Sequence, residues 1–107
     1  MKKIIFLISL LIFSININAQ TDDVKRANDI TALMTKALSL NKEDQSKVYQ
    51  IQLERFQEVT LIRDKYEDNP EIKRAELRKV YNKLYGKLKG NLGEKKMFLW
   101  QKYKRNN

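Results

Sequence analysis

The segment Asp68–Leu92 reads DNPEIKRAELRKVYNKLYGKLKGNL, and it determines the fold class predicted for the chain. Pro70 suits the first turn of a helix, because a proline lacks only an N–H that has no intrahelical partner there. Apolar residues then recur at steps of four, three and four: Leu77, Tyr81, Leu84 and Leu88. This spacing is typical of the packed face of a helix. The sequence therefore predicts a helix from Pro70 or Glu71 to about Gly90.

Three further helices are predicted around this one. The first spans Asp22 to Leu38, with Thr21 as its N-cap and two aspartates in its first turn. The second begins at Asn41, a strong N-cap residue, and ends near residues 68–69, because proline disfavours a helical residue before it. With only three Gly and one Pro in 107 residues, we expect an all-α fold of four helices.

The fourth helix, from about Glu94 to Lys104, is short, basic and aromatic. Two interpretations stay open. In one, the helix binds the surface of an anionic membrane. In the other, Phe98 and Trp100 cap the helical bundle and the lysines are solvated, because a short helix must bury something to stay folded.

The first nineteen residues have the order of a secretory signal peptide. Two lysines follow Met1, an apolar run covers residues 4–15, and the small Ala19 precedes the expected cleavage point. The run is too short for a membrane span, which needs about twenty residues. We therefore expect a cleaved signal peptide at 1–19 and a helical domain at 20–107. The product is expected in the periplasm, or secreted if the source has no outer membrane.

The chain contains neither cysteine nor histidine. Disulfides, Cys or Ser–His nucleophiles, and thiolate or imidazole metal sites are therefore excluded. Two carboxylate pairs at helical spacing, Glu54/Glu58 and Asp64/Asp68, are flanked by basic residues and are interpreted as solvated charge. We predict no enzyme activity, no metal site and no cofactor.

Positive charge is concentrated in the C-terminal part of the chain. Residues 20–70 hold eight basic and ten acidic residues, whereas residues 71–107 hold twelve basic and three acidic, a net charge of +9. Expected counterparts are acidic unfolded chains or anionic lipids; export argues against nucleic acid. A solvated face without a partner is the alternative. The candidate client-binding residues are Arg74, Arg78, Lys79, Lys83, Tyr85 and Lys87.

Two helix junctions share a pattern. Leu40-Asn41-Lys42-Glu43-Asp44, followed by Gln45, and Leu92-Gly93-Glu94-Lys95-Lys96 each place a leucine and a capping position before a helix. This arrangement resembles the paired LTxxQ motifs of the Spy/CpxP family of periplasmic chaperones and stress adaptors. Asn41 and Gly93 stand at the two Thr positions. Asp44 and Lys96 stand at the two Gln positions, with Gln45 one place late.

The resemblance implies an elongated, bent helical hairpin that pairs into an antiparallel homodimer. It also implies ATP-independent binding of partly folded clients on a basic surface with apolar spots. Metal-sensing relatives use His or Cys ligands, which this chain lacks. Two other functions are retained as alternatives: a non-enzymatic module that docks on one envelope protein, and a binder of anionic membrane surfaces.

Overall fold

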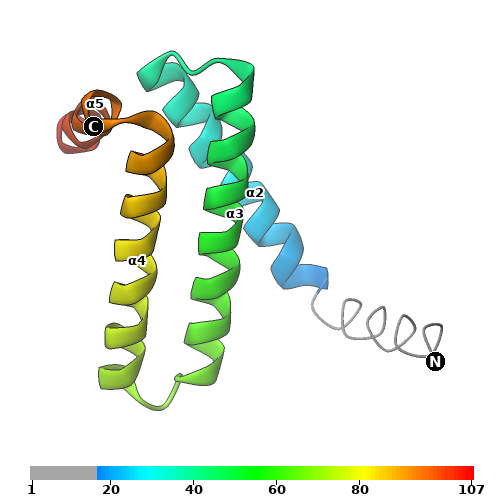
Figure 1. Ribbon diagram of the computed structural model, residues 1–107. Helices are drawn as coiled ribbons and strands as arrows, with labels where there is room; N and C mark the ends of the chain where they lie inside the picture. Colours follow the sequence, from blue (N-terminus) through cyan, green and yellow to red (C-terminus); the bar gives the residue numbers. More distant parts are fainter. Residues whose placement is uncertain (1–16) are drawn as a thin grey trace, which may run out of the picture.

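The computed structural model describes residues 17–107, and this part of the chain is all-α, as predicted (Figure 1). It contains four helices and no strand: α2 (Ile17–Leu38), α3 (Lys42–Lys65), α4 (Pro70–Leu92) and α5 (Glu94–Asn106). None of these helices combines the length and the apolar character needed to cross a membrane. Residues 1–16 of the predicted signal peptide lie outside the described residues.

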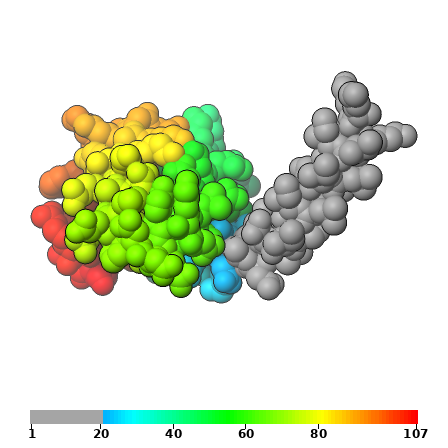
Figure 2. All heavy atoms as spheres, turned by 90° about the horizontal axis from the view of Figure 1, so that it is seen from below, coloured from blue at the N-terminus to red at the C-terminus, as the bar shows by residue number. Residues whose placement is uncertain are grey.

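α3 packs against both α2 and α4, and α5 contacts α2 and α4 at one end of the molecule. α3 and α4 lie side by side and antiparallel, and α2 packs against α3 (Figure 1). α5 is a short helix that contacts both α2 and α4, next to the turn between α2 and α3. Figure 2, seen from the end that holds the α3–α4 turn, shows α3 and α4 in close contact with α5 at one side. Chain segments distant in sequence therefore meet at the α5 end.

The beginning of α2 differs from the prediction. Thr21 lies inside the helix and is not its N-cap, because the preceding residues from Ile17 are already helical. Ala19 and Gln20 are good helix formers, so the sequence gives no reason to begin at Thr21. Asp23, predicted as a charge in the first turn of the helix, has a different role. Its side chain is buried and its Oδ1 accepts a hydrogen bond from Thr60 Oγ1 at 3.0 Å, which ties α2 to α3.

The turn between α2 and α3 is held by caps on both sides. Ser39 adopts a left-handed conformation with φ 53°, and Leu40 N–H donates to Thr35 O at 3.2 Å. This is the bond pattern that closes many helix C-termini. The predicted N-cap of α3 is confirmed, since Asn41 Oδ1 accepts from Asp44 N at 2.8 Å. The hydrogen bond from its backbone N–H to Asn41 therefore holds Asp44 in the first turn of α3.

The α3–α4 and α4–α5 junctions shift slightly from their predicted places. α3 ends at Lys65, a few residues before the predicted end. Asn69 caps α4 by accepting from Ile72 N at 3.3 Å, and Pro70 takes the first turn as predicted. α4 continues past Gly90 to Leu92, because Gly90 keeps helical backbone and the break comes at Gly93, where φ is +88°.

The core lies at the end of the molecule where α5 meets the α2–α3 turn. All four helices and the turn contribute to its buried residues, which are Met34, Leu38, Leu40, Val48, Leu88, Met97 and Trp100. Trp100 therefore caps the bundle as expected. The same expectation is wrong for Phe98, which is 62% exposed. Phe98 and Trp100 are two residues apart on the helix, so their side chains point about 200° apart around its axis. Only one of the two rings can therefore face the core.

Candidate functional site

The six predicted client-binding residues all lie on α4, but on two different faces. Lys79, Lys83 and Lys87 follow one another at steps of four and form what we call the lysine face. Arg74, Arg78 and Tyr85 lie, together with Tyr81, on what we call the arginine–tyrosine face. At about 100° per residue, the two faces point about 160° apart around the helix axis. A single flat ligand surface cannot contact both.

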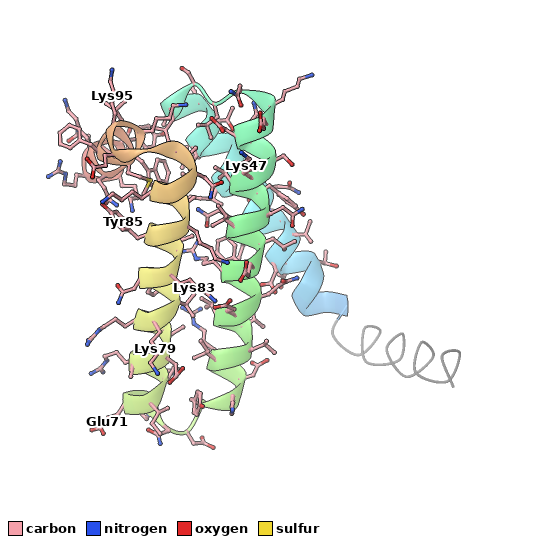
Figure 3. The ribbon with its side chains drawn as sticks, in the orientation of Figure 1. Lys47, Glu71, Lys79, Lys83, Tyr85 and Lys95 are labelled. Atoms are coloured by element: carbon pink, nitrogen blue, oxygen red, sulfur yellow. The ribbon has the colours of Figure 1, made fainter. Side chains whose placement is uncertain are left out.

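The lysine face is already paired with carboxylates. Lys87 Nζ lies 2.9 Å from Glu54 Oε2, and Lys83 pairs with Glu58 and, at 3.7 Å, with Glu54. Lys79 pairs with Glu76 on α4 itself at 3.0 Å. Figure 3 labels Lys79 and Lys83 on α4. The positive charge of the lysine face is therefore largely balanced by carboxylates on α3 and α4. This reduces the attraction that the lysine face offers to an acidic ligand.

These ion pairs shift two pKa values. The hydrogen bond from Lys87 lowers the pKa of the Glu54 carboxyl below its ordinary value; partial burial opposes this, and the charges of Lys87 and Lys83 add to it. The hydrogen bond to Glu58 raises the pKa of Lys83, against a smaller opposing effect of desolvation. Both shifts favour the charged forms. Lys83 and Lys87 therefore join α4 to α3 by ion pairs, which we call the α3–α4 clamp, whereas Lys79 pairs within α4.

The arginine–tyrosine face remains open to a ligand. Arg74 and Arg78 are exposed, and within residues 17–107 neither forms an ion pair. Tyr81 and Tyr85 are 42% and 45% exposed. Residues at steps of four, three and four stack along one side of a helix. Two guanidinium groups and two phenol rings thus form one continuous strip.

The two motif junctions, more than fifty residues apart in sequence, contact each other. Lys96 Nζ lies 3.5 Å from Asp44 Oδ2, so the residues at the two Gln positions form an ion pair. Gln45 Nε2 donates to Leu40 O at 2.9 Å. Leu40 is buried in the core and Leu92 packs against it. The structure therefore gives the motif residues a structural role in joining the N-termini of α3 and α5.

Sequence reasoning missed Gln52 and Arg55 on α3. Gln52 is buried, and Arg55 is half-buried beside it. Both lie at helical spacing from Val48 and Val59, the buried apolar residues of α3. That spacing was the available signal: two polar residues on the inner face of a helix need partners. Arg55 is one of the basic residues that flank the Glu54/Glu58 pair in the sequence, and that position alone does not show its burial.

Within residues 17–107, no group of three or more Asp or Glu side chains is placed to hold a metal ion. The chain has no His or Cys to replace them.

No known family model, curated protein or solved structure matches the chain. The Spy/CpxP resemblance therefore stays a prediction that depends on the two junctions.

Proposed function

We propose that the chain is an exported, ATP-independent, chaperone-like or envelope stress-adaptor protein of Spy/CpxP type, which binds partly folded proteins. The proposal depends on one observation: two guanidinium groups without an ion pair among the described residues and two half-exposed tyrosine rings share one face of α4. Partly folded chains expose apolar groups and carboxylates together. The periplasm is the proposed location, or the exterior if the source has one membrane.

The chemistry of this face suits weak and unselective binding. Arginine can hold a carboxylate by two hydrogen bonds, and tyrosine adds apolar area with a polar end. Within residues 17–107, neither arginine is held in an ion pair, so both can adapt to different clients. Mixed contacts of this kind favour a promiscuous binder over a specific one. We place the principal client contacts on Arg74, Arg78 and Tyr85, with Lys79, Lys83 and Lys87 as a secondary face.

An aggregation assay tests the proposal. Purified protein is added to an aggregating model client without ATP, and light scattering is followed as salt is raised. We expect suppression that weakens with salt, because exposed charges are screened. Absence of suppression at every salt concentration would reject the proposal.

Two charge-matched double variants locate the site. Arg74→Gln with Arg78→Gln removes two charges from the arginine–tyrosine face, and Lys95→Gln with Lys102→Gln removes two from α5. We expect the first pair to lose most of the suppression and the second to keep it. Equal losses from both pairs would show that net charge, and not this face, binds the client.

The same face also fits a module that docks on one envelope protein. Crosslinking in an envelope extract distinguishes the two: many weakly captured proteins support the chaperone, and one dominant protein supports the module. The proposed homodimer is tested separately by sedimentation equilibrium.

A membrane-surface function is a second candidate, and α5 provides its observation. Phe98 and Leu99 are exposed, and Lys95 and Lys102 lie beside Phe98 on the outer face of the helix. An exposed apolar ring among lysines is typical of helices that bind anionic lipid surfaces. Flotation with anionic and neutral liposomes tests it, and an equal distribution between the two would reject it.

A further inference from the structure

A cavity of about 450 Å³ lies where the four helices meet. Its walls are mostly apolar and aromatic, and these lining residues include Ile30, Tyr81, Leu84, Tyr85, Met97 and Trp100. Figure 3 labels Tyr85 on the part of α4 that lies closest to α5. Small-molecule sites in proteins have this size and likewise combine apolar walls with polar groups that orient the ligand.

Arg55 contributes a guanidinium group to the lining of this cavity. Its Nη1 donates to Gln52 Oε1 at 3.0 Å, and its guanidinium carbon lies 4.0 Å from the Phe56 ring centre and 5.8 Å from that of Tyr81. Its Nε is buried and has no hydrogen-bond partner in the part of the chain that the structure describes. A buried donor without an acceptor is costly. Because Nε itself is not open to the cavity, a ligand would meet Arg55 through the other N–H groups of its guanidinium.

Gln52 positions this guanidinium. The Gln52 side chain is 2% exposed, and its Nε2 lies 3.5 Å from Met34 Sδ on α2 while its Oε1 accepts from Arg55. Both ends of the amide therefore have a partner, which favours this orientation of the Gln52 side chain. Arg55 is thus held against the cavity by an acceptor on its own helix.

The charged side chains in and around the cavity are positively charged. Burial lowers the pKa of the Arg55 guanidinium; Tyr81 opposes this, and the positive charges of Arg26 and Arg63 add to it. Lys104 also lines the cavity, with its Nζ 5.6 Å from the Trp100 ring centre. The lining includes no Asp or Glu, and within residues 17–107 Arg55 forms no ion pair with one. The site thus has positive charge and no built-in counter-ion.

We propose that this cavity binds a small carboxylate with an apolar tail, such as a medium-chain fatty acid. The planar guanidinium of Arg55 matches the two oxygens of a carboxylate. The tail would occupy the space between Tyr85, Leu84 and Trp100. A phosphate is a poorer fit, because its greater charge needs more donors than a wall of this composition supplies. The inference does not depend on client binding by the arginine–tyrosine face.

The single tryptophan of the chain gives a direct signal, because Trp100 lines the cavity. The full-length protein is titrated with octanoate below its micelle concentration, and Trp emission is followed. We expect a saturable change. Octanol, which has the tail without the charge, is expected to bind at least about tenfold more weakly, and acetate, which lacks the tail, to give no change. Equal binding of octanol and octanoate, or no saturable change with octanoate, would overturn the proposal.

Two arginine variants on α3 identify the anchoring residue. Arg55→Gln is expected to weaken octanoate binding about 10- to 100-fold, the effect of losing hydrogen bonds to a charged group. Arg63→Gln removes the same charge from an exposed position that does not line the cavity, and is expected to change affinity by no more than about twofold. Circular dichroism verifies folding. Equal affinities for Arg55→Gln and wild type would overturn the assignment. If Arg55→Gln does not fold, the octanoate and octanol comparison on the unchanged protein decides.

The outcomes of this test and of the client assay are separable. Arg78 does not line the cavity, so the arginine–tyrosine variants are expected to keep octanoate binding while they lose suppression. A protein that binds octanoate and suppresses no aggregation would refute the proposed function and leave the cavity assignment intact.

Discussion

Lys96 Nζ lies 3.5 Å from Asp44 Oδ2, which joins the first turn of α5 to the first turn of α3. The side chains are 35% and 18% exposed, so the pair is shielded from solvent more than an ordinary surface pair. It also involves the residues that stand at the Gln positions of the two motif-like junctions. In this pair each side chain supplies the opposite charge that the other needs.

A double-mutant cycle measures this pair. Asp44→Asn and Lys96→Gln, alone and together, are expected to show a favourable coupling of about 0.3–1 kcal/mol in urea unfolding. Asp44→Asn combined with Lys95→Gln is the matched control, because Lys95 is exposed and makes no ion pair in the described part of the chain. A coupling that is as large with Lys95 as with Lys96 would show that only long-range charge is involved.

Gly93 and Gly90 are predicted to respond in opposite directions to alanine. Neither site has an atom from a more distant part of the chain within 4 Å of an added Cβ, so only the local backbone conformation decides the effect. Gly93 has φ 88° and ψ 165°, a region that is nearly restricted to glycine, and Gly93→Ala is expected to cost about 1–3 kcal/mol. Gly90 lies inside α4, and Gly90→Ala is expected to stabilise by about 0.5–1 kcal/mol. Thermal unfolding of both variants gives the signs, and equal signs would contradict the assigned break at Gly93.

Trp100 and Phe98 are predicted to differ sharply in their effect on stability. Trp100 is 3% exposed within the core cluster, and Trp100→Ala is expected to cost about 3–5 kcal/mol. Phe98 is mostly exposed, and Phe98→Ala is expected to change stability by less than about 0.5 kcal/mol. Urea unfolding measures both. A large loss on removal of Phe98 would instead indicate that another copy or partner covers this ring.

The fold class followed from local features that the sequence shows directly. Asn41, Pro70 and the near absence of glycine predicted helices in the right order, because caps and breakers act within a few residues. The boundaries that shifted depend on less local conditions. Gly90 looked like a helix end, yet it keeps helical backbone and the chain turns only at Gly93. Thr21 looked like a cap, yet the helix was already formed before it.

The candidate site was harder to predict, because it depends on which helices meet. Periodicity places Lys83 and Lys87 on one face of α4, but only the packing of α3 shows that Glu54 and Glu58 neutralise them. The cavity beside Arg55 requires four helices at once, and no single-helix pattern reveals it. Pairing of Asp44 with Lys96 was likewise beyond local reasoning, since 52 positions separate them in the sequence.

The pH dependence of stability tests the α3–α4 clamp. The hydrogen bond from Lys87 holds the pKa of Glu54 below its ordinary value of 4.5, with burial opposing. A carboxyl with a lowered folded-state pKa stabilises the fold above the unfolded pKa, and this contribution disappears as pH falls through the folded value. Glu54→Gln is therefore expected to destabilise near neutral pH by less than about 1 kcal/mol, because the pair is about half exposed.

The difference between wild type and Glu54→Gln should shrink as the pH falls through the lowered folded-state pKa of Glu54. Urea unfolding of both proteins at about pH 7 and about pH 3 measures it. Glu67→Gln is the control: Glu67 is exposed and forms no ion pair within residues 17–107, so its substitution is expected to leave stability nearly unchanged at both pH values. The sign is the decisive part of the result. If the destabilisation by Glu54→Gln grew as the pH fell, Glu54 would be stabilising the fold in its protonated form, and Lys83 and Lys87 would not form the clamp that their distances indicate.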